Sequence, residues 1–279
     1  MTLAAFQVSW GKAYKYFPLK SVFLCCIVIF EIGSLVVALA PSSLAIIIGR
    51  AVQGAGGAGV TGGCYIIAAF ITRPERMAQI VGLFGTAWSF SSVLGPVLGG
   101  VFTEHVTWRW CFWVNLPIGG AAIAIILIFF NTPKASRVAH ATWKEVALQL
   151  DVGGIVLLLS ALTCLLLALQ MGGVTTPWNA SKPIGLIVGF GLIIVVLVVL
   201  EWRQGEKSMV VFRIAKRRTM AAALIFGFCV HCGSFARNYN LPIYFQAVQG
   251  VSPSESGIRT LPSVLATCMF FLPEYNVHA

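Results

Sequence analysis

The stretch Leu94-Gly95-Pro96-Val97-Leu98-Gly99-Gly100 lies within a long, uncharged hydrophobic segment of the chain. In water such a stretch breaks a helix, because proline removes an amide donor and each glycine costs about 1 kcal/mol. In a bilayer, neighbouring helices satisfy the freed backbone groups, and glycines let another helix approach closely. The stretch therefore predicts a bent membrane helix of the kind that lets a transporter rock.

The residues around this stretch have the composition of a multi-pass membrane protein. Hydrophobic residues make up 58% and charged residues 10% of the 279 residues, and the mean hydropathy is +0.88. A soluble domain carries roughly 25% charged residues. A bilayer span takes about 20 residues, and the apolar runs of that length are 21–40, 44–70, 80–102, 111–130, 152–170, 184–202 and 219–247. We therefore expect an all-α helix bundle with about 7 complete spans and partial spans at 1–10 and 257–272.

The net charge of +10 is distributed unevenly between alternate loops. One side holds fourteen basic residues: Lys12, Lys15, Lys20, Arg73, Arg76, Lys134, Arg137, Lys144, Arg203, Lys207, Arg213, Lys216, Arg217 and Arg218. The other side holds three: Arg109, Lys182 and Arg259. Because cytoplasmic loops are enriched in Lys and Arg, this asymmetry places the Lys12–Lys20 loop in the cytoplasm. The net positive charge is thus explained by the loops of a membrane protein, and we expect no nucleic-acid partner.

The sequence contains no catalytic or metal-binding constellation that competes with a transport function. The eight cysteines lie mostly in apolar runs, where cysteine packs as a small hydrophobic residue. Cys229-Val230-His231-Cys232 has the spacing of a metal motif but lacks a second pair of ligands. Neither a Gly-x-Ser-x-Gly elbow nor a Walker-type phosphate loop is present. We therefore predict no enzymatic activity, metal or cofactor.

Three ionisable residues lie well inside the spans: Glu31, Arg50 and Arg237. Arg237 is near the outer end of its span, where snorkelling explains it as well as function does, so Glu31 and Arg50 are the candidates for a role in transport. A charge in hydrocarbon costs several kcal/mol and marks a functional candidate. Glu31 falls about ten residues into its span, near the midplane, and is expected to exchange a proton or to bind a charged substrate. The alternative for Glu31 is a structural role, hydrogen-bonded on a packed face. Arg50 lies about 9 Å from the outer end of its span and needs a partner or a wet cavity.

Two loop segments carry further signals. Trp143, Val146, Ala147 and Leu150 have helical spacing, which predicts a short interfacial helix within the linker 131–150. A loop that runs directly into the next span is the alternative. Asn179-Ala180-Ser181 is an N-glycosylation sequon on the predicted outer side, so the topology permits modification of Asn179.

Several segments together carry a more specific pattern: the loop Gly11–Lys20 with Gly11, Lys12, Lys15 and Lys20; Arg50-Ala51-Val52-Gln53-Gly54; Gly82, Gly95-Pro96 and Gly99-Gly100; Trp108-Arg109-Trp110-Cys111-Phe112-Trp113-Val114-Asn115-Leu116-Pro117; and Leu241–Gln246 with Ser256–Arg259. These segments resemble the major facilitator superfamily, and specifically the fourteen-span drug:proton antiporter branch common in fungi. The resemblance implies that Arg50 takes part in proton transfer and that Gly82, Gly95, Pro96, Gly99 and Gly100 form the antiporter motif. The chain departs from the family pattern at Lys15, where an Asp is usual, and at Ser91, where a Gly is usual.

By this resemblance the chain is divided into four parts. Residues 1–130 form a partial N-terminal bundle, 131–150 the cytoplasmic linker, 151–203 two extra spans and 204–279 the start of a C-terminal bundle. The resemblance implies proton-coupled export of small apolar molecules by alternating access, with protons and a small molecule as partners and no obligate protein partner. It places the protein in the plasma membrane, with the vacuolar membrane as an alternative. A truncated, transport-incompetent remnant and an importer or vacuolar carrier of the same fold are the alternative functions.

Overall fold

The structure is a computed structural model that describes residues 1–130, 151–173, 175–205, 213, 216–251, 255–257, 259–260 and 262–263, without the side chains at 93, 96, 97 and 104. Within these ranges the regular structure is helical, and one isolated bridge joins Gly172 to Thr176. The predicted interfacial helix at 131–150 and most of the run 257–272 lie outside the described residues.

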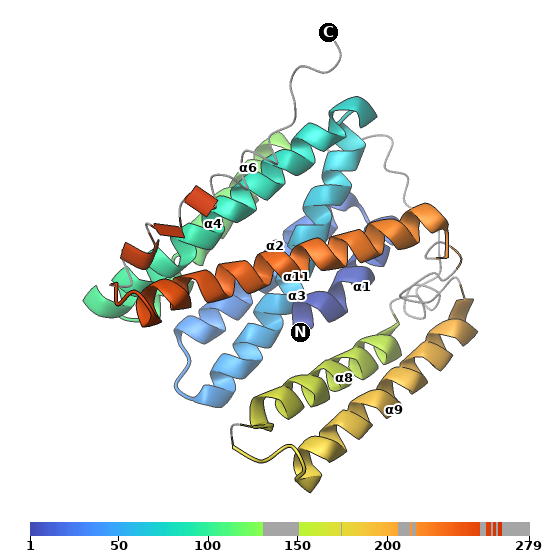
Figure 1. Cartoon of the computed structure of the whole chain (residues 1–279). Helices are drawn as coiled ribbons and strands as arrows, with labels where there is room; N and C mark the ends of the chain where they lie inside the picture. The colour runs from blue at the N-terminus through green and yellow to red at the C-terminus, as the bar shows by residue number, and fades with distance from the viewer. Residues whose placement is uncertain are drawn as a thin grey trace. The chain divides into compact units, whose positions relative to one another are not determined.

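The helices belong to two units, each described here by itself. The first unit, residues 1–64 and 115–216, contains α1 (Thr2–Tyr16), α2 (Leu19–Ala38), most of α3 (Ser43–Ile71), α6 (Asn115–Phe129), α8 (Val152–Met171) and α9 (Ser181–Gln204). The second unit, residues 65–114 and 217–279, contains η1 (Pro74–Arg76), α4 (Met77–His105), α5 (Trp110–Trp113) and α11 (Arg218–Ala247). Figure 1 shows these elements along the chain.

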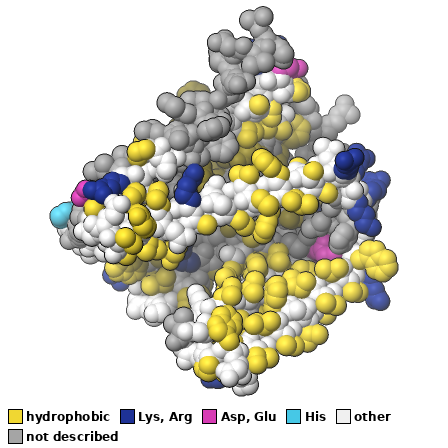
Figure 2. Space-filling model, viewed as in Figure 1, with side chains coloured by type: hydrophobic (Ala, Val, Ile, Leu, Met, Phe, Trp, Pro, Cys, Tyr) yellow, Lys and Arg dark blue, Asp and Glu magenta, His cyan; other side chains and the backbone are white. Residues whose placement is uncertain are grey.

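Helices long and apolar enough to cross a membrane confirm the predicted all-α membrane fold. Six such helices occur among the described residues: Leu19–Ala38, Ser43–Ile71, Trp110–Phe129, Val152–Met171, Ser181–Gln204 and Arg218–Ala247. Each matches one of the predicted spans to within three residues at both ends. The predicted span 80–102 lies inside α4, a helix of 29 residues. Hydrophobic side chains follow the visible faces of α8 and α9 in Figure 2, as expected for helices that face lipid.

Close packing of α3 against α2 depends on glycines. A Cβ at Gly56 would come within 2.8 Å of the Cys26 carbonyl oxygen, and one at Gly33 within 2.6 Å of the Gln53 Cα. These positions therefore accept no larger residue without a shift of backbone. Small residues at a membrane helix crossing let the two backbones approach, which increases dispersion contacts that lipid cannot replace.

The first helix is longer than the sequence predicted. Residues 10–20 were expected to form a loop, but α1 continues to Tyr16 and α2 begins at Leu19, so the connection is only Phe17 and Pro18. The helix is held by aromatic side chains that reach α3: Trp10 Nε1 donates to the Ala55 carbonyl at 2.7 Å, and Tyr14 Oη donates to the Gly59 carbonyl at 3.0 Å. Tyr14 is buried, so this bond replaces one with water.

The helices of the segment 151–203, α8 and α9, form a hairpin and lie side by side in Figure 1. At one end, Asp151 caps α8 by accepting from the Gly154 amide at 3.1 Å, and it also accepts from Gln204 Nε2 of α9 at 3.0 Å. At the other end, the Trp178 ring covers Gly172 and Gly173, and Gly173 has a φ of 78° that favours glycine. The hairpin contacts α1, and Thr163 Oγ1 lies 3.7 Å from the sulfur of Met1, the residue before that helix.

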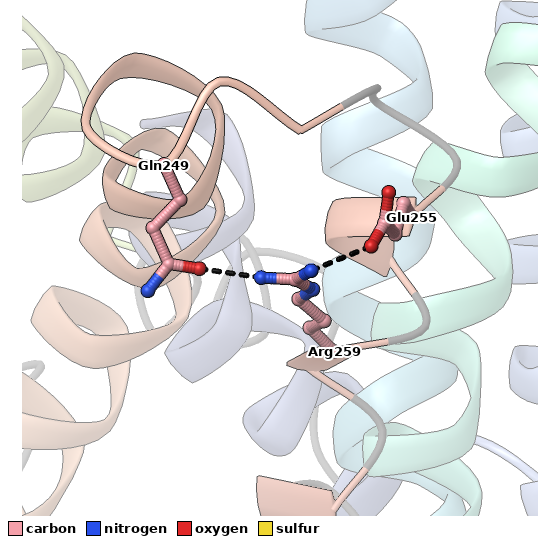
Figure 3. A network of polar contacts seen from close by, with 3 residues as sticks. All are labelled: Gln249, Glu255 and Arg259. Carbon is pink, nitrogen blue, oxygen red and sulfur yellow. Dashed lines mark hydrogen bonds and ion pairs between the residues drawn. The ribbon is translucent and has the colours of Figure 1, made fainter.

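In the second unit, polar side chains tie the segment after α11 to the end of that helix. Ser256 is fully buried and its hydroxyl donates to the carbonyl of Pro242 at 3.1 Å. Arg259 donates to Gln249 at 2.6 Å and forms an ion pair with Glu255 at 2.6 Å (Figure 3). Both ion-pair side chains are exposed, so the pair contributes at most about 1 kcal/mol. These contacts join the motif segments Leu241–Gln246 and Ser256–Arg259.

Candidate functional site

A cluster of polar side chains lies where α2, α3 and α6 meet in the first unit. Arg50 Nη1 donates to Gln53 Oε1 at 2.8 Å, and Gln53 Nε2 donates to Ser34 Oγ at 2.8 Å. Asn115 Nδ2 of α6 donates to the same Ser34 oxygen at 3.3 Å. We call these four residues, Arg50, Gln53, Ser34 and Asn115, the polar bridge.

The direction of each hydrogen bond in the polar bridge follows from the chemistry of its members. An arginine carries only donors, so the oxygen of the Gln53 amide must face Arg50 and its NH2 group must face Ser34. The Ser34 hydroxyl donates its hydrogen to the Phe30 carbonyl at 3.1 Å and accepts from Gln53 and Asn115. A hydroxyl has one hydrogen and two lone pairs, so Ser34 is fully satisfied. Ser34 and Gln53 are both buried, and Arg50 lies at the exposed end of the bridge.

Glu31 lies one helical turn from Ser34, against Gly119 of α6. A Cβ at Gly119 would collide with the Glu31 carboxylate, so only glycine leaves room for this side chain. The second carboxylate oxygen, Oε2, is buried and has no hydrogen-bond partner among the described residues. A charged carboxylate with an unpartnered oxygen in an apolar setting is costly, and that cost disappears when a proton or a cationic ligand neutralises it.

The two predicted ionisable residues, Glu31 and Arg50, thus belong to the same three-helix junction. Glu31 lies seven residues before the end of α2 at Ala38, about 10 Å by the helical rise. Arg50 lies seven residues after the start of α3 at Ser43, close to the predicted depth.

The residues of the predicted antiporter motif lie together on α4, in the second unit. Gly82, Gly95, Pro96, Gly99 and Gly100 fall inside this helix. Apart from the backbone of α4 itself and the adjoining residues, no described atom lies within 4 Å of the position that a Cβ would take at Gly95, Gly99 or Gly100. Most glycines of α3 differ, because they lie against atoms of α1 or α2, although Gly62 is open in the same way. The role of the α4 motif residues as a hinge stays a prediction.

The basic residues of the first connection are divided between two helices. Gly11, Lys12 and Lys15 lie in α1, and Lys20 lies in α2. Lys20 Nζ donates to the carbonyls of Leu127 at 3.0 Å and Phe130 at 2.8 Å, so it caps the end of α6. The carboxylates of Asp151 and Glu201 attract the ammonium of Lys12. Both are buried at the same end of the α8–α9 hairpin.

The remaining predicted sites are isolated. Asn179 is exposed in the turn between α8 and α9, which is compatible with glycosylation. Cys229, His231 and Cys232 lie on α11, where His231 Nδ1 is 2.8 Å from the Gly227 carbonyl of its own helix. Within the described part of the chain, no group of three His, Cys, Asp or Glu side chains could hold a metal ion.

Comparison with known proteins identifies the family. The family model for the Major Facilitator Superfamily matches residues 1–273, so the chain belongs to this superfamily of membrane proteins. Similar curated proteins come from fungi. The MFS-type transporter grgE of a Penicillium species is 47% identical over 265 residues, which cover 95% of this chain and 47% of that protein.

Two further relatives have names that state a direction of transport. The efflux pump notK of an Aspergillus species is 43% identical over 253 residues, 91% of this chain and 45% of the relative. The dehydrocurvularin exporter of Alternaria cinerariae is 42% identical over 259 residues, 93% of this chain and 45% of the relative. The chain thus spans about half the length of the relatives that it matches.

Proposed function

We propose that the protein is a proton-coupled exporter of small, mostly apolar molecules that works by alternating access. The observation that carries this proposal is the junction of α2, α3 and α6, where Glu31 and Arg50 lie among apolar helices. An isolated carboxylate and a guanidinium at membrane depth are expensive, and such residues in transporters mark proton and substrate pathways. Family membership supports transport rather than catalysis.

Glu31 is the group that gains and loses the proton. Its Oε2 is buried without a partner, so protonation removes the cost of an uncompensated charge, and deprotonation must be stabilised by a change in its surroundings. Arg50 is anchored by the oxygen of the neutral Gln53 amide, and in the proposed cycle its positive charge would favour proton release when it comes near Glu31. Alternating exposure of such a pair to the two sides of the membrane couples proton entry to substrate exit.

Export is preferred over import because relatives at 42–43% identity are named an efflux pump and an exporter. Small apolar secondary metabolites are the proposed substrate class, and the plasma membrane is the proposed location. Apolar helices with few polar groups suit such a substrate, because an apolar molecule loses few hydrogen bonds with water when it enters an apolar pathway.

The test uses inverted membrane vesicles that contain the protein expressed from its complete gene. The probes are a lipophilic rhodamine dye and dehydrocurvularin, and an acidic vesicle interior drives their uptake. We expect uptake that depends on the gradient and a matching loss of interior acidity when the probe is added. Arg50→Ala should abolish this uptake, whereas Arg73→Ala, at an exposed arginine outside the spans, should not. Uptake that is unaffected when a proton ionophore collapses the gradient would contradict the proposal.

A further inference from the structure

The seam between α2 and α6 holds two contacts that lie one helical turn apart. Ser34 and Glu31 are three residues apart on α2, and Asn115 and Gly119 are four residues apart on α6. Ser34 accepts a hydrogen bond from Asn115, and Glu31 fits against Gly119. Because residues three or four apart share a helix face, both contacts lie along one line. A movement of α6 away from α2 therefore breaks both contacts together.

The same seam determines how Arg50 is held. The orientation of the Gln53 amide, and with it the oxygen that Arg50 uses, depends on the acceptor that Ser34 offers to Gln53 Nε2. With Ser34 replaced by alanine, the buried Gln53 NH2 group loses its acceptor. The loss destabilises this orientation of the amide and favours its rotation. Rotation would present NH2 to a guanidinium, which repels it. The anchor of Arg50 is thus fixed by a residue of α2.

We infer that Ser34 and Asn115 are positioning residues. They connect the hydrogen bond that holds Arg50 on Gln53 to the α2–α6 contact at which Glu31 packs against Gly119. This inference rests on the proposed function, since it assigns a role to the two residues in proton coupling. When α6 lies against α2, the bridge is complete and Glu31 is packed against Gly119. When α6 separates, Ser34 loses a donor and Glu31 loses its apolar cover in the same movement. Neither residue titrates, so each acts only through Arg50 and Glu31.

The groups that titrate near the seam are few, which makes a pH profile informative. Charged or titratable side chains of the three helices are Lys20, Cys25, Cys26 and Glu31 on α2 and Arg50, Cys64 and Tyr65 on α3, and α6 contributes none. On α1, which also packs here, they are Lys12, Tyr14, Lys15 and Tyr16. Lys20 is occupied at the opposite end of α6. The Arg50 guanidinium stays protonated at every assay pH, so a change in the pH profile on substitution at Ser34 or Asn115 reports on Glu31.

The experiment compares Ser34→Ala, Asn115→Leu and the double variant in the vesicle assay with the rhodamine dye, across a range of external pH. Ser9→Ala removes a buried hydroxyl from α1, outside the bridge, and is the matched control. We expect each single variant to lower the maximal rate about tenfold, the equivalent of one hydrogen bond of about 1.4 kcal/mol. The pH of half-maximal transport should shift while KM for the dye stays within about twofold. The double variant should be no worse than Ser34→Ala, because both substitutions remove the Ser34–Asn115 bond and Ser34→Ala also removes the acceptor of Gln53 Nε2.

Thermal unfolding of the purified variants separates this inference from the proposed function. Non-additive losses of stability for Ser34→Ala and Asn115→Leu would show that the bond exists, whether or not the vesicles transport. If the wild type transports with proton coupling but the variants keep its pH profile, the bond is structural and the inference is overturned while the function stands. Additive effects on the maximal rate would also overturn it. A wild type without proton-coupled transport overturns both.

Discussion

Glu31 of α2 and Gly119 of α6 fit so closely that any side chain at position 119 would displace the carboxylate. The neighbouring Gly120 faces the other way, with no described atom within 4 Å of the position of a Cβ. Two consecutive glycines on one helix therefore have opposite requirements. Gly119 accommodates an ionisable group, and Gly120 is open.

This difference predicts the effect of two alanine substitutions. Gly119→Ala should reduce gradient-driven uptake in vesicles about tenfold or more, because Glu31 must leave its position or α6 must move, and positioning losses of this size are common. Gly120→Ala should keep normal uptake and add slightly to helix stability, since alanine is favoured over glycine by up to about 1 kcal/mol. Immunoblots confirm equal protein amounts. Glu31→Asp, which is one methylene shorter, should restore part of the activity in the Gly119→Ala background. Equal activity of the two alanine variants would show that the Glu31–Gly119 contact has no role.

The helical composition of the fold could be predicted from the sequence because apolar runs of span length have few other solutions in a bilayer. Six of these runs occur as helices with matching ends, and the seventh, 80–102, lies within α4. The connection at 10–20 was predicted wrongly, because its basic residues and Pro18 suggested a loop, whereas lysine has adequate helix propensity and only Phe17 and Pro18 lie outside the two helices.

The candidate site could be predicted only in part. Glu31 and Arg50 stand out as charges in apolar runs, but Ser34, Gln53, Asn115 and Gly119 were not identified as site residues. Serine, glutamine and asparagine are ordinary in membrane helices, and their pairing depends on which helices meet. The Gln53 of the Arg50-Ala51-Val52-Gln53-Gly54 segment was the available signal, because a buried amide three residues from an arginine needs a partner.

Lys20 is expected to stabilise α6 rather than to take part in transport. Its ammonium donates to two carbonyls at the end of that helix, so Lys20→Met should lower the free energy of unfolding by about 1 kcal/mol. Thermal unfolding of the purified protein in detergent measures this loss as a lower Tm. Lys20→Arg keeps a donor and should retain most of the stability. Lys182→Met removes an exposed lysine at the start of α9 and should leave Tm unchanged. A Tm of Lys20→Met equal to that of the wild type would refute the capping role.

Lys12 is expected to fasten the α8–α9 hairpin to α1. Asp151 and Glu201 are each 5% exposed, and both carboxylates attract the partly buried ammonium of Lys12. Lys12→Gln removes this positive charge near two buried carboxylates, which should lower Tm. Lys15→Gln, at an exposed lysine in the same turn, is the control. Identical Tm values for the two variants would argue against this fastening.

The charge asymmetry of the loops predicts the topology. Lys15→Cys and Thr175→Cys, each at an exposed position and each in a protein without native cysteines, should react with membrane-impermeant maleimide from opposite sides. Residue 15 should be labelled only in inverted vesicles, and residue 175 only in intact cells. Labelling of both residues from the same side would contradict the assignment of the spans.

The central claim is that Glu31 carries the coupled proton, and the most direct measurement compares two modes of transport by Glu31→Gln. The substitution is close to isosteric and keeps the side chain neutral at every pH. Exchange of labelled for unlabelled rhodamine dye without a gradient requires no net proton movement and should stay near the wild-type rate. Accumulation driven by an acidic vesicle interior should disappear, whereas Glu75→Gln, at an exposed carboxylate in the connection before α4, should accumulate dye normally. Gradient-driven accumulation by Glu31→Gln at the wild-type level would contradict the account.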